Sequence, residues 1–250
     1  MGADLSYAYL KNSKCLGTWF RQSNLFRTDF REAILLGADF EKARLCEANL
    51  TRANLRQAKL IGTNLTEADL TAVDLDEIEW NSRTQWSNAI GLHTARNIPE
   101  ELHKHPEFSA AFILSQGIEL VRTGSVEEAL TAYKEAQRIM PHLKISAHSW
   151  NQLCWFGTLH GYASNVLFAG NSAVAIAPEN WDFRDSQAVA RGASGDLEGA
   201  HDDLKFILEK NSWNASENVK RIRRKWISLI ETGVNPFTAD ELHIVRETEA

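Results

Sequence analysis

A five-residue rhythm runs through the first third of the chain and limits what it can fold into. Residues 3–77 divide into fifteen consecutive blocks, such as ADLSY, TDFRE and ANLTR, with no insertion. The third residue of each block is Leu or Phe except at Cys15, and the first is Ala, Ser, Thr or Val. A fixed short period predicts a solenoid, in which each unit buries its apolar side only against its neighbours.

A period of five fits neither the 3.6 residues of a helical turn nor the two-residue alternation of a strand, so the chain has to turn a corner within each block. Four such sides close into a square coil. Coils stacked about 4.8 Å apart satisfy their backbone hydrogen bonds from one coil to the next. The central Leu and Phe then fill the interior, and Phe20, Phe40 and Leu60 stack on one side.

The pattern A(D/N)LXX over residues 3–77 resembles the pentapeptide-repeat family. This resemblance implies a right-handed quadrilateral β-helix of about four coils, which we assign to residues 1–79. Residues 80–107 are expected to be a capping or linker segment in which Trp80 and Trp86 plug the open end of the core. No capping helix precedes the first block. Its edge is therefore frayed or covered by a partner, or the chain is a piece of something longer.

The second half of the chain has the spacing of helical pairs. In residues 110–141, Gly117 and Ala129 let two antiparallel helices approach closely, and Gly124 makes the turn. This unit and those over 147–180 and 181–210 resemble the 34-residue tetratricopeptide repeat. The predicted fold class is β + α, with a tetratricopeptide-like α-helical solenoid over 108–210 and a helical cap over 211–250.

Within the cap, the basic run Lys220–Lys225 is interpreted as the solvated face of an amphipathic helix. Thr238 followed by Glu241 predicts the start of a short last helix. The two kinds of repeat, together with the segments WNQLCWFG and NPFTADEL, resemble cyanobacterial pentapeptide-repeat proteins with a tetratricopeptide-like tail.

Composition and motifs argue against several classes of function. The net charge is −6 and no basic stripe is present, so we expect no nucleic-acid partner. No apolar run reaches the length of a transmembrane span and no signal peptide precedes the repeats, which predicts a cytoplasmic protein without a membrane partner. Cys15, Cys46 and Cys154 lack C-x-x-C spacing, which fits a reducing compartment. Catalytic signatures are missing too, so we expect no enzyme, catalytic residue, cofactor or metal.

The remaining hypothesis is a scaffold or adaptor that binds a protein or peptide, because both resemblances imply interaction surfaces. The first helix of each pair would line a groove, and Asn151 and Trp155 are its best candidates for partner contact. His148 and Asp185 would lie beside them in the groove. Core packing explains Trp155 equally well.

The β-helix offers a second candidate surface. With four blocks per coil, Leu16, Ile34 and Leu36 should point outward on the same side of neighbouring coils, and Trp19 is a further outward apolar residue. A clustered apolar patch indicates an interface. It could be covered by the chain's own C-terminal domain, by a partner or a second copy in a homodimer, or by nothing.

An alternative function is inhibition of a nucleic-acid enzyme such as a topoisomerase by DNA mimicry, an activity that the pentapeptide-repeat resemblance allows. A mimic of DNA needs a long, strongly negative side. Over residues 1–79, however, Asp and Glu only slightly outnumber Lys and Arg, and arginines from Arg21 to Arg56 lie among them. The pattern therefore favours the adaptor, and leaves its partner and biological process open.

Overall fold

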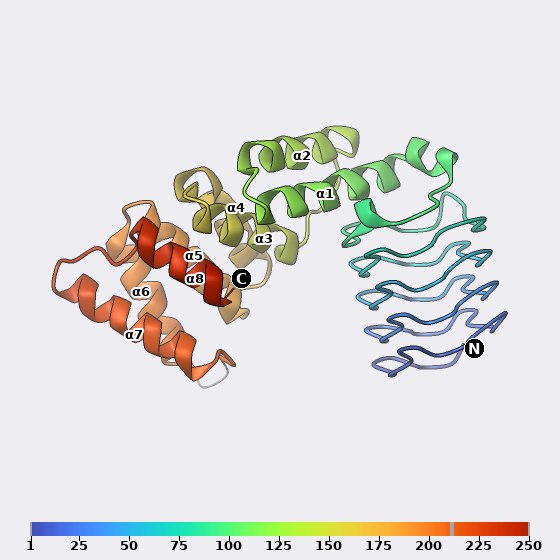
Figure 1. Ribbon diagram of the computed structural model, residues 1–250, viewed down its shortest axis with the longest axis horizontal. Coiled ribbons are helices and arrows are strands. Elements are labelled where there is room, and N and C mark those ends of the chain that lie inside the picture. The colour runs from blue at the N-terminus through green and yellow to red at the C-terminus, as the bar shows by residue number, and fades with distance from the viewer. Residues whose placement is uncertain (1, 211–212, 250) are drawn as a thin grey trace. The chain divides into compact units, whose positions relative to one another are not determined.

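The computed structural model describes residues 2–210 and 213–249. The chain divides into two compact units, one formed by Met1–Gly117 with Leu130–Ile145 and the other by Ile118–Ala129 with Ser146–Ala250. Stacked coils make up most of the first unit, and helices make up the second (Figure 1). No helix in the described part of the chain is long and apolar enough to cross a membrane.

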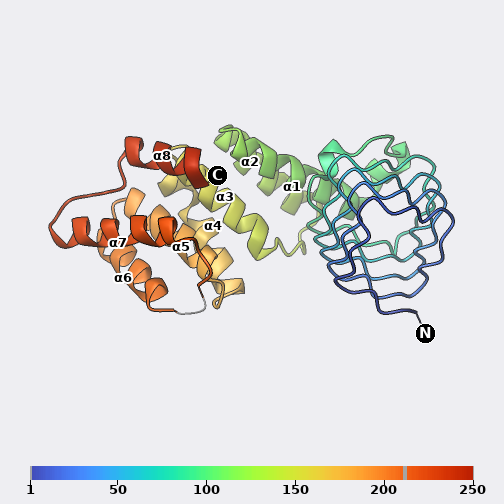
Figure 2. The ribbon, with the colours of Figure 1, turned by 60° about the horizontal axis from the view of Figure 1, so that its bottom comes forward.

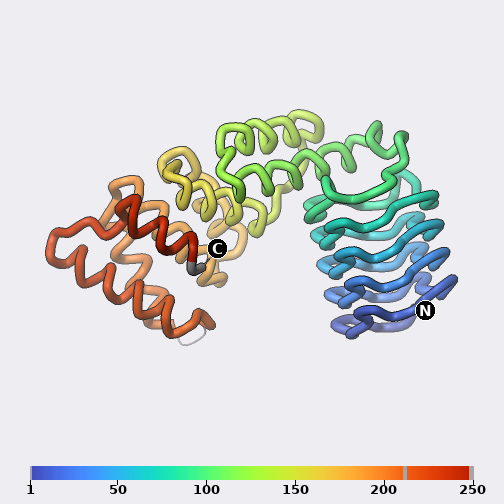
Figure 3. The backbone as a smooth tube through the Cα atoms, in the orientation of Figure 1, coloured from blue at the N-terminus to red at the C-terminus, as the bar shows by residue number. Residues whose placement is uncertain are grey.

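The coils of the first unit have four sides each (Figure 2) and stack one on another along the tube (Figure 3). Parallel bridges join Asp4 to Asn24 and Tyr9 to Asp29, and this spacing of 20 residues continues along the tube. Backbone hydrogen bonds such as that from the Leu5 N–H to the Asn24 carbonyl (2.8 Å) tie each coil to the next. The predicted four-sided β-helix is therefore confirmed.

The corners explain why the repeat has five residues. The fifth residue of every block has a positive φ, from 53° at Glu77 to 66° at Gly37 and Gly62. A hydrogen bond closes the corner in the first fourteen blocks, from the Ala8 N–H and the Leu5 carbonyl (3.0 Å) to the Val73 N–H and the Leu70 carbonyl (3.2 Å). Residues other than Gly enter this left-handed region at a cost, so the corners store strain that coil stacking has to offset.

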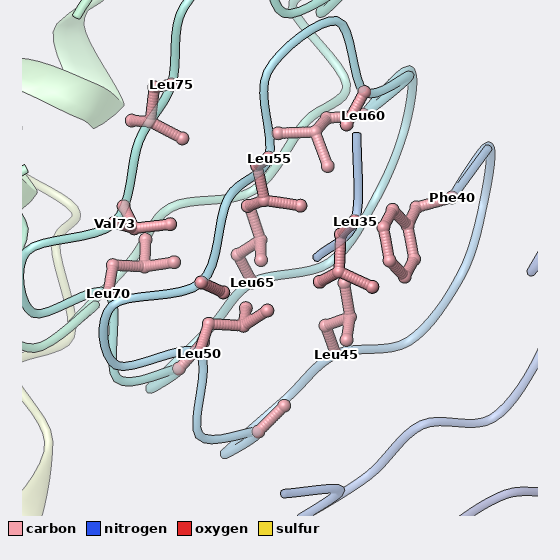
Figure 4. Packing of buried hydrophobic residues seen from close by; sticks show 14 of the residues in the cluster. Leu35, Phe40, Leu45, Leu50, Leu55, Leu60, Leu65, Leu70, Val73 and Leu75 are labelled. Atoms are coloured by element: carbon pink, nitrogen blue, oxygen red, sulfur yellow. The ribbon is translucent and has the colours of Figure 1, made fainter. Parts of the chain in front are cut away.

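Inward side chains from the blocks fill the tube (Figure 4). From the fifth block to the fifteenth, the central Leu or Phe is fully buried. The rings of Phe20 and Phe40 stack as predicted, with centroids 5.0 Å apart, and Phe30 meets both edge-on. Two threonine hydroxyls at the first position of a block bond to the preceding coil: Thr28 Oγ1 donates to the Leu5 carbonyl (2.8 Å) and Thr63 Oγ1 to the Phe40 carbonyl (2.7 Å). The interior is thus close-packed, and the buried hydroxyls of Thr28 and Thr63 are paired within it.

The ladder continues past the predicted end of the β-helix at residue 79. Its last bridges have spacings of 21 or 22 residues and are Asn64 to Gln85, Asp69 to Ile90 and Asp74 to Arg96. Blocks of this last coil can be longer than five residues because no further coil stacks on them and fixes their register. The segment predicted as a linker therefore contains the final coil.

The end of the tube next to this final coil is plugged by aromatic residues, as predicted for Trp86. Trp86 is fully buried, and its ring lies edge-on to Phe108 with centroids 5.2 Å apart. Trp80 is only half-buried and packs against His105 at the margin. The Glu107 carboxylate accepts hydrogen bonds from the Trp86 N–H (3.0 Å) and from Ser87, so the first turn of α1 is fixed to the last coil. The cap consists of the 3₁₀ helices η1 (Leu92–Thr94) and η2 (Glu100–Lys104) and the start of α1 (Pro106–Arg122).

Helical pairs follow the cap in sequence, as predicted. Small residues allow close approach within them: a Cβ on Gly157 of α3 would lie 2.6 Å from the side chain of Val166 on α4. The α-helical nature of this region is confirmed, whereas its assignment to the tetratricopeptide family stays a prediction. The helices after α1 are α2 (Val126–Ile139), α3 (Ala147–Leu159), α4 (Ala163–Ile176), α5 (Trp181–Ala193), α6 (Leu197–Leu208), α7 (Glu217–Glu231) and α8 (Ala239–Glu249).

Two Leu→Ala substitutions on opposite sides of the coil wall test this fold. Leu50→Ala should lower the free energy of unfolding of the β-helix by about 2–5 kcal/mol, because Leu50 is fully buried in the ladder. Leu16→Ala should change it by about 0.5 kcal/mol or less, because Leu16 is 56% exposed. Urea denaturation followed by far-UV circular dichroism measures both. Equal losses in the two variants would contradict the inward placement of the third residue.

Candidate protein-binding surfaces

Three apolar residues that the sequence analysis grouped together lie on one side of neighbouring coils. Lys14 pairs with Ile34 in a parallel bridge, and the Gly17 N–H donates to the Leu36 carbonyl (2.9 Å), so Leu16 and Leu36 occupy equivalent positions one coil apart. Leu16 is 56% exposed, and Ile34 and Leu36 are half-buried. We call these three residues the coil patch. Backbone bonds on both strands of the ladder hold them in place, so they cannot turn inward.

Aromatic side chains of the first coil are more exposed than the coil patch. Trp19 is 83% exposed, Tyr9 73% and Tyr7 64%. In the bridged positions of the next coil, Trp19 is paired with Asp39 and Tyr9 with Asp29, so the outer surface changes from aromatic to acidic within one coil. Trp19 was predicted to be an outward apolar residue, whereas neither tyrosine was predicted. Both could have been recognised as exposed aromatic residues, because Tyr7 and Tyr9 occupy the fifth and second positions of their blocks, which are polar in most later blocks.

Ion pairs between coils mix positive and negative charge over the outer surface. Arg27 pairs with Glu47 at 2.7 Å, and Arg56 with Asp76 at 2.7 Å. Exposed pairs of this kind contribute about 1 kcal/mol or less each. These pairs matter for the charge pattern of the outer surface, because positive side chains interrupt the acidic ones along the tube. Further pairs between coils join Arg21 to Asp39 and Lys59 to Glu79, and Arg31 pairs with Asp29 within one block.

The predicted groove residues lie on α3 and α5 of the second unit, and three of them remain at least partly accessible. His148 is exposed near the start of α3, and its ring contacts the Gln152 side chain (3.2 Å). Asn151 is half-buried, and its side-chain oxygen is buried without a hydrogen-bond partner. Trp155 is half-buried against the apolar cluster of this unit, so its packing role is established.

Asp185, the fourth predicted groove residue, is not accessible to a partner. It is 6% exposed and Arg223 of α7 is fully buried, with Arg223 Nε donating to Asp185 Oδ1 (2.9 Å) and Nη2 to Oδ2 (2.8 Å). The guanidinium also lies 4.5 Å from the ring centroid of Trp226. Placing the whole basic run in solvent was therefore wrong for Arg223, because it shares a helix face with Trp226 three residues later.

Cys154 is held in a place where it cannot act as a nucleophile at neutral pH. Its side chain is fully buried, and a Cβ on Gly170 of α4 would lie 2.7 Å from its sulfur. Burial raises the pKa of the Cys154 thiol to about 12. The reactive thiolate is therefore scarce at physiological pH. Over residues 2–210 and 213–249, no group of three His, Cys, Asp or Glu side chains could hold a metal ion.

Comparison with known proteins supports the repeat assignment of the coils. Residues 23–60 and 48–78 match the family model of pentapeptide repeats, with eight copies. No curated protein matches the chain.

Solved structures with detectable similarity include pentapeptide repeat proteins of cyanobacteria. HetL of Nostoc sp. strain PCC 7120, described as involved in regulating heterocyst differentiation, is 39% identical over 36% of this chain and 38% of its own, with a TM-score of 0.35. The protein alr5209 of Nostoc PCC 7120 is 29% identical over 40% of this chain and 75% of its own, with a TM-score of 0.34. Rfr23 of Cyanothece 51142 is 39% identical over 32% of this chain and 51% of its own, with a TM-score of 0.25. This chain therefore spans well under two thirds of HetL and of Rfr23.

Removing one partner of the buried ion pair between Asp185 and Arg223 should lower the free energy of unfolding strongly, and removing both partners should lower it much less. Asp185→Ala removes the carboxylate that accepts two hydrogen bonds from the fully buried Arg223 guanidinium, which we expect to lower the stability of the helical unit by about 3–5 kcal/mol. Adding Arg223→Met should restore most of this loss. Urea denaturation monitored by helical circular dichroism provides the measurement. As a control, Glu217→Ala removes the exposed partner of Lys220 on the same helix α7 and should cost about 1 kcal/mol or less.

Thiol labelling tests the inert state of Cys154. With excess iodoacetamide at mildly alkaline pH, Cys154 should react only as fast as the helical unit opens, because it is buried and its pKa is raised to about 12. The half-buried Cys15 should be alkylated earlier. Peptide mass spectrometry over time separates the two sites. Rapid labelling of Cys154 in the folded protein would reopen the possibility of a catalytic thiol.

Proposed function

We propose that this chain is a non-enzymatic protein-binding scaffold whose accessible binding surface is the outer face of the β-helix. The observation that supports it best is the exposure of Trp19 (83%) close in sequence to Leu16 (56%) on a coil fixed by backbone hydrogen bonds. Trp and Tyr supply much of the binding energy at protein interfaces. A rigid support also lowers the entropy lost on binding, since the exposed side chains are already positioned.

The partner we propose is a protein with an apolar surface that covers the coil patch together with Trp19. A second copy of this chain would satisfy the same chemistry and give a homodimer. We place this interaction in the cytoplasm, where the three free cysteines Cys15, Cys46 and Cys154 would stay reduced. We further propose that the helical pairs are tetratricopeptide-like and supply a second, separate binding region.

DNA mimicry has less support than scaffolding. Arg27 and Arg56 are paired with carboxylates of the neighbouring coil, so positive charge lies within the acidic surface. A duplex carries one negative charge per about 1.7 Å of axis without interruption. The mixed surface of these coils does not reproduce that charge pattern.

Affinity capture with the tagged full chain tests the proposal. Trp19→Ala and Leu16→Asp should each abolish retention of a partner that the wild type captures, and both should leave folding intact because these side chains are exposed. Phe168→Ala serves as the matched control, since Phe168 is also exposed (47%) but lies on α4. Light scattering of the purified protein tests the homodimer with the same variants. Partners that survive both coil substitutions, or that are lost equally with Phe168→Ala, would refute the assignment to the β-helix.

A further inference from the structure

We propose that the groove formed by α3 and α5 is a peptide-binding site that the chain's own residues 235–246 occupy. Its external ligand would be a partner segment of the same chemistry, namely an aromatic anchor followed by a short amphipathic helix. This inference concerns the helical unit alone and stands apart from the proposed binding surface on the coils.

The anchor is Phe237, which fills a slot in α5. A Cβ built on Gly192 would lie 2.0 Å from the Phe237 ring, so the slot exists only because residue 192 has no side chain. The ring is 6% exposed and lies edge-on to Trp226 of α7, with centroids 5.1 Å apart. The close fit of the Phe237 ring against Gly192 is typical of a specific pocket. A larger residue at position 192, or a larger ring at position 237, would not fit.

Residues 235–238 shape the segment without help from the rest of the unit. Asn235 Oδ1 accepts a hydrogen bond from the Phe237 N–H (2.8 Å), which holds the anchor in a tight turn. Thr238 Oγ1 accepts from the Glu241 N–H (3.3 Å), so Thr238 caps α8 as predicted. A segment with its own turn and its own helix cap can adopt the bound form as a short peptide.

The helix α8 lays one apolar stripe on the groove. Leu242 and Val245, three residues apart, are buried in one cluster with Leu159 of α3 and Val189 of α5. The opposite side of α8 is exposed, including Asp240 and His243. This is the arrangement by which amphipathic helices bind in grooves, with anchors three or four residues apart.

Polar contacts at both ends set the direction of the segment. Near its start, Glu241 Oε1 accepts from Trp226 Nε1 (3.1 Å) and from Lys225 Nζ (3.0 Å). Near its end, the Arg246 guanidinium lies 3.3 Å from the Nδ1 of His160, the residue that follows α3. The ligand chemistry is therefore an aromatic residue, an acidic residue four positions later and a basic residue nine positions later.

The segment can leave the groove without unwinding its neighbour. The connection that follows α7 is exposed over residues 232–235. In contrast, α7 itself is fixed by the buried pair of Arg223 and Asp185. Displacement of residues 235–246 would thus open the groove while the rest of the unit stays folded.

Fluorescence anisotropy with the full chain and a labelled synthetic peptide of residues 234–247 tests the proposal. Full-length Phe237→Ala should bind this peptide at least tenfold more tightly than the wild type, because the weakened internal segment competes less for the site. Val234→Ala, at an exposed position beside the segment (49%), should behave like the wild type. A peptide in which the phenylalanine is alanine should not bind.

A second variant separates release of the segment from binding of the peptide. Gly192→Ala should expel the Phe237 ring and speed tryptic cleavage at Arg246, yet it should bind no wild-type peptide because its slot is filled. Circular dichroism confirms that each variant is folded, and Leu242→Ala replaces Phe237→Ala if the latter is not. The proposal fails if a folded variant with a released segment and an intact Gly192 does not bind the peptide, or if the wild type binds it equally well.

Discussion

The stacking of inward Leu and Phe side chains at a spacing of 20 residues is the constraint on which the first unit depends. Each stacked pair brings two coils into the register in which their backbone groups can bond, and each bond fixes the next inward side chain. The strained corners are tolerated because this reciprocal arrangement overdetermines them. The backbone of each coil then fixes which side chains point outward, so apolar groups such as Trp19 stay in solvent.

Features that repeat in the sequence could be predicted, and features that depend on a single distant contact could not. The five-residue period placed Phe20 on Phe40, and a Trp beyond the last regular block predicted the plug at Trp86. The longer spacings of the last coil were missed because nothing repeats there. The burial of Arg223 was missed because its partner Asp185 is 38 residues away, and the local pattern of α7 shows only a basic run.

The candidate sites show the same division. The coil patch followed from counting blocks, so Leu16 and Leu36 were brought together correctly. The groove residues were predicted from repeat positions alone. Such positions carry the assumption that the first helix of every pair is open to solvent. They could not show that Phe237 fills the space beside Gly192, because neither residue belongs to a recognisable motif. The two surfaces therefore differ physically. The coil patch stays at the surface of the tube, whereas the face of α5 at Gly192 is covered by Phe237 of the same chain.

The four-sided period has a consequence for how such a tube can change in length. Loss of one five-residue block between Phe20 and Phe40 would turn all earlier sides by a quarter relative to the cap and would put Phe20 out of line with Phe40. Loss or duplication of four blocks would shorten or lengthen the tube and keep every side aligned. Insertions and deletions that preserve the fold should therefore comprise whole coils of four blocks. The outer surface of the tube would then grow or shrink by one coil at a time, while the packing around the buried Trp86 at its end stays the same.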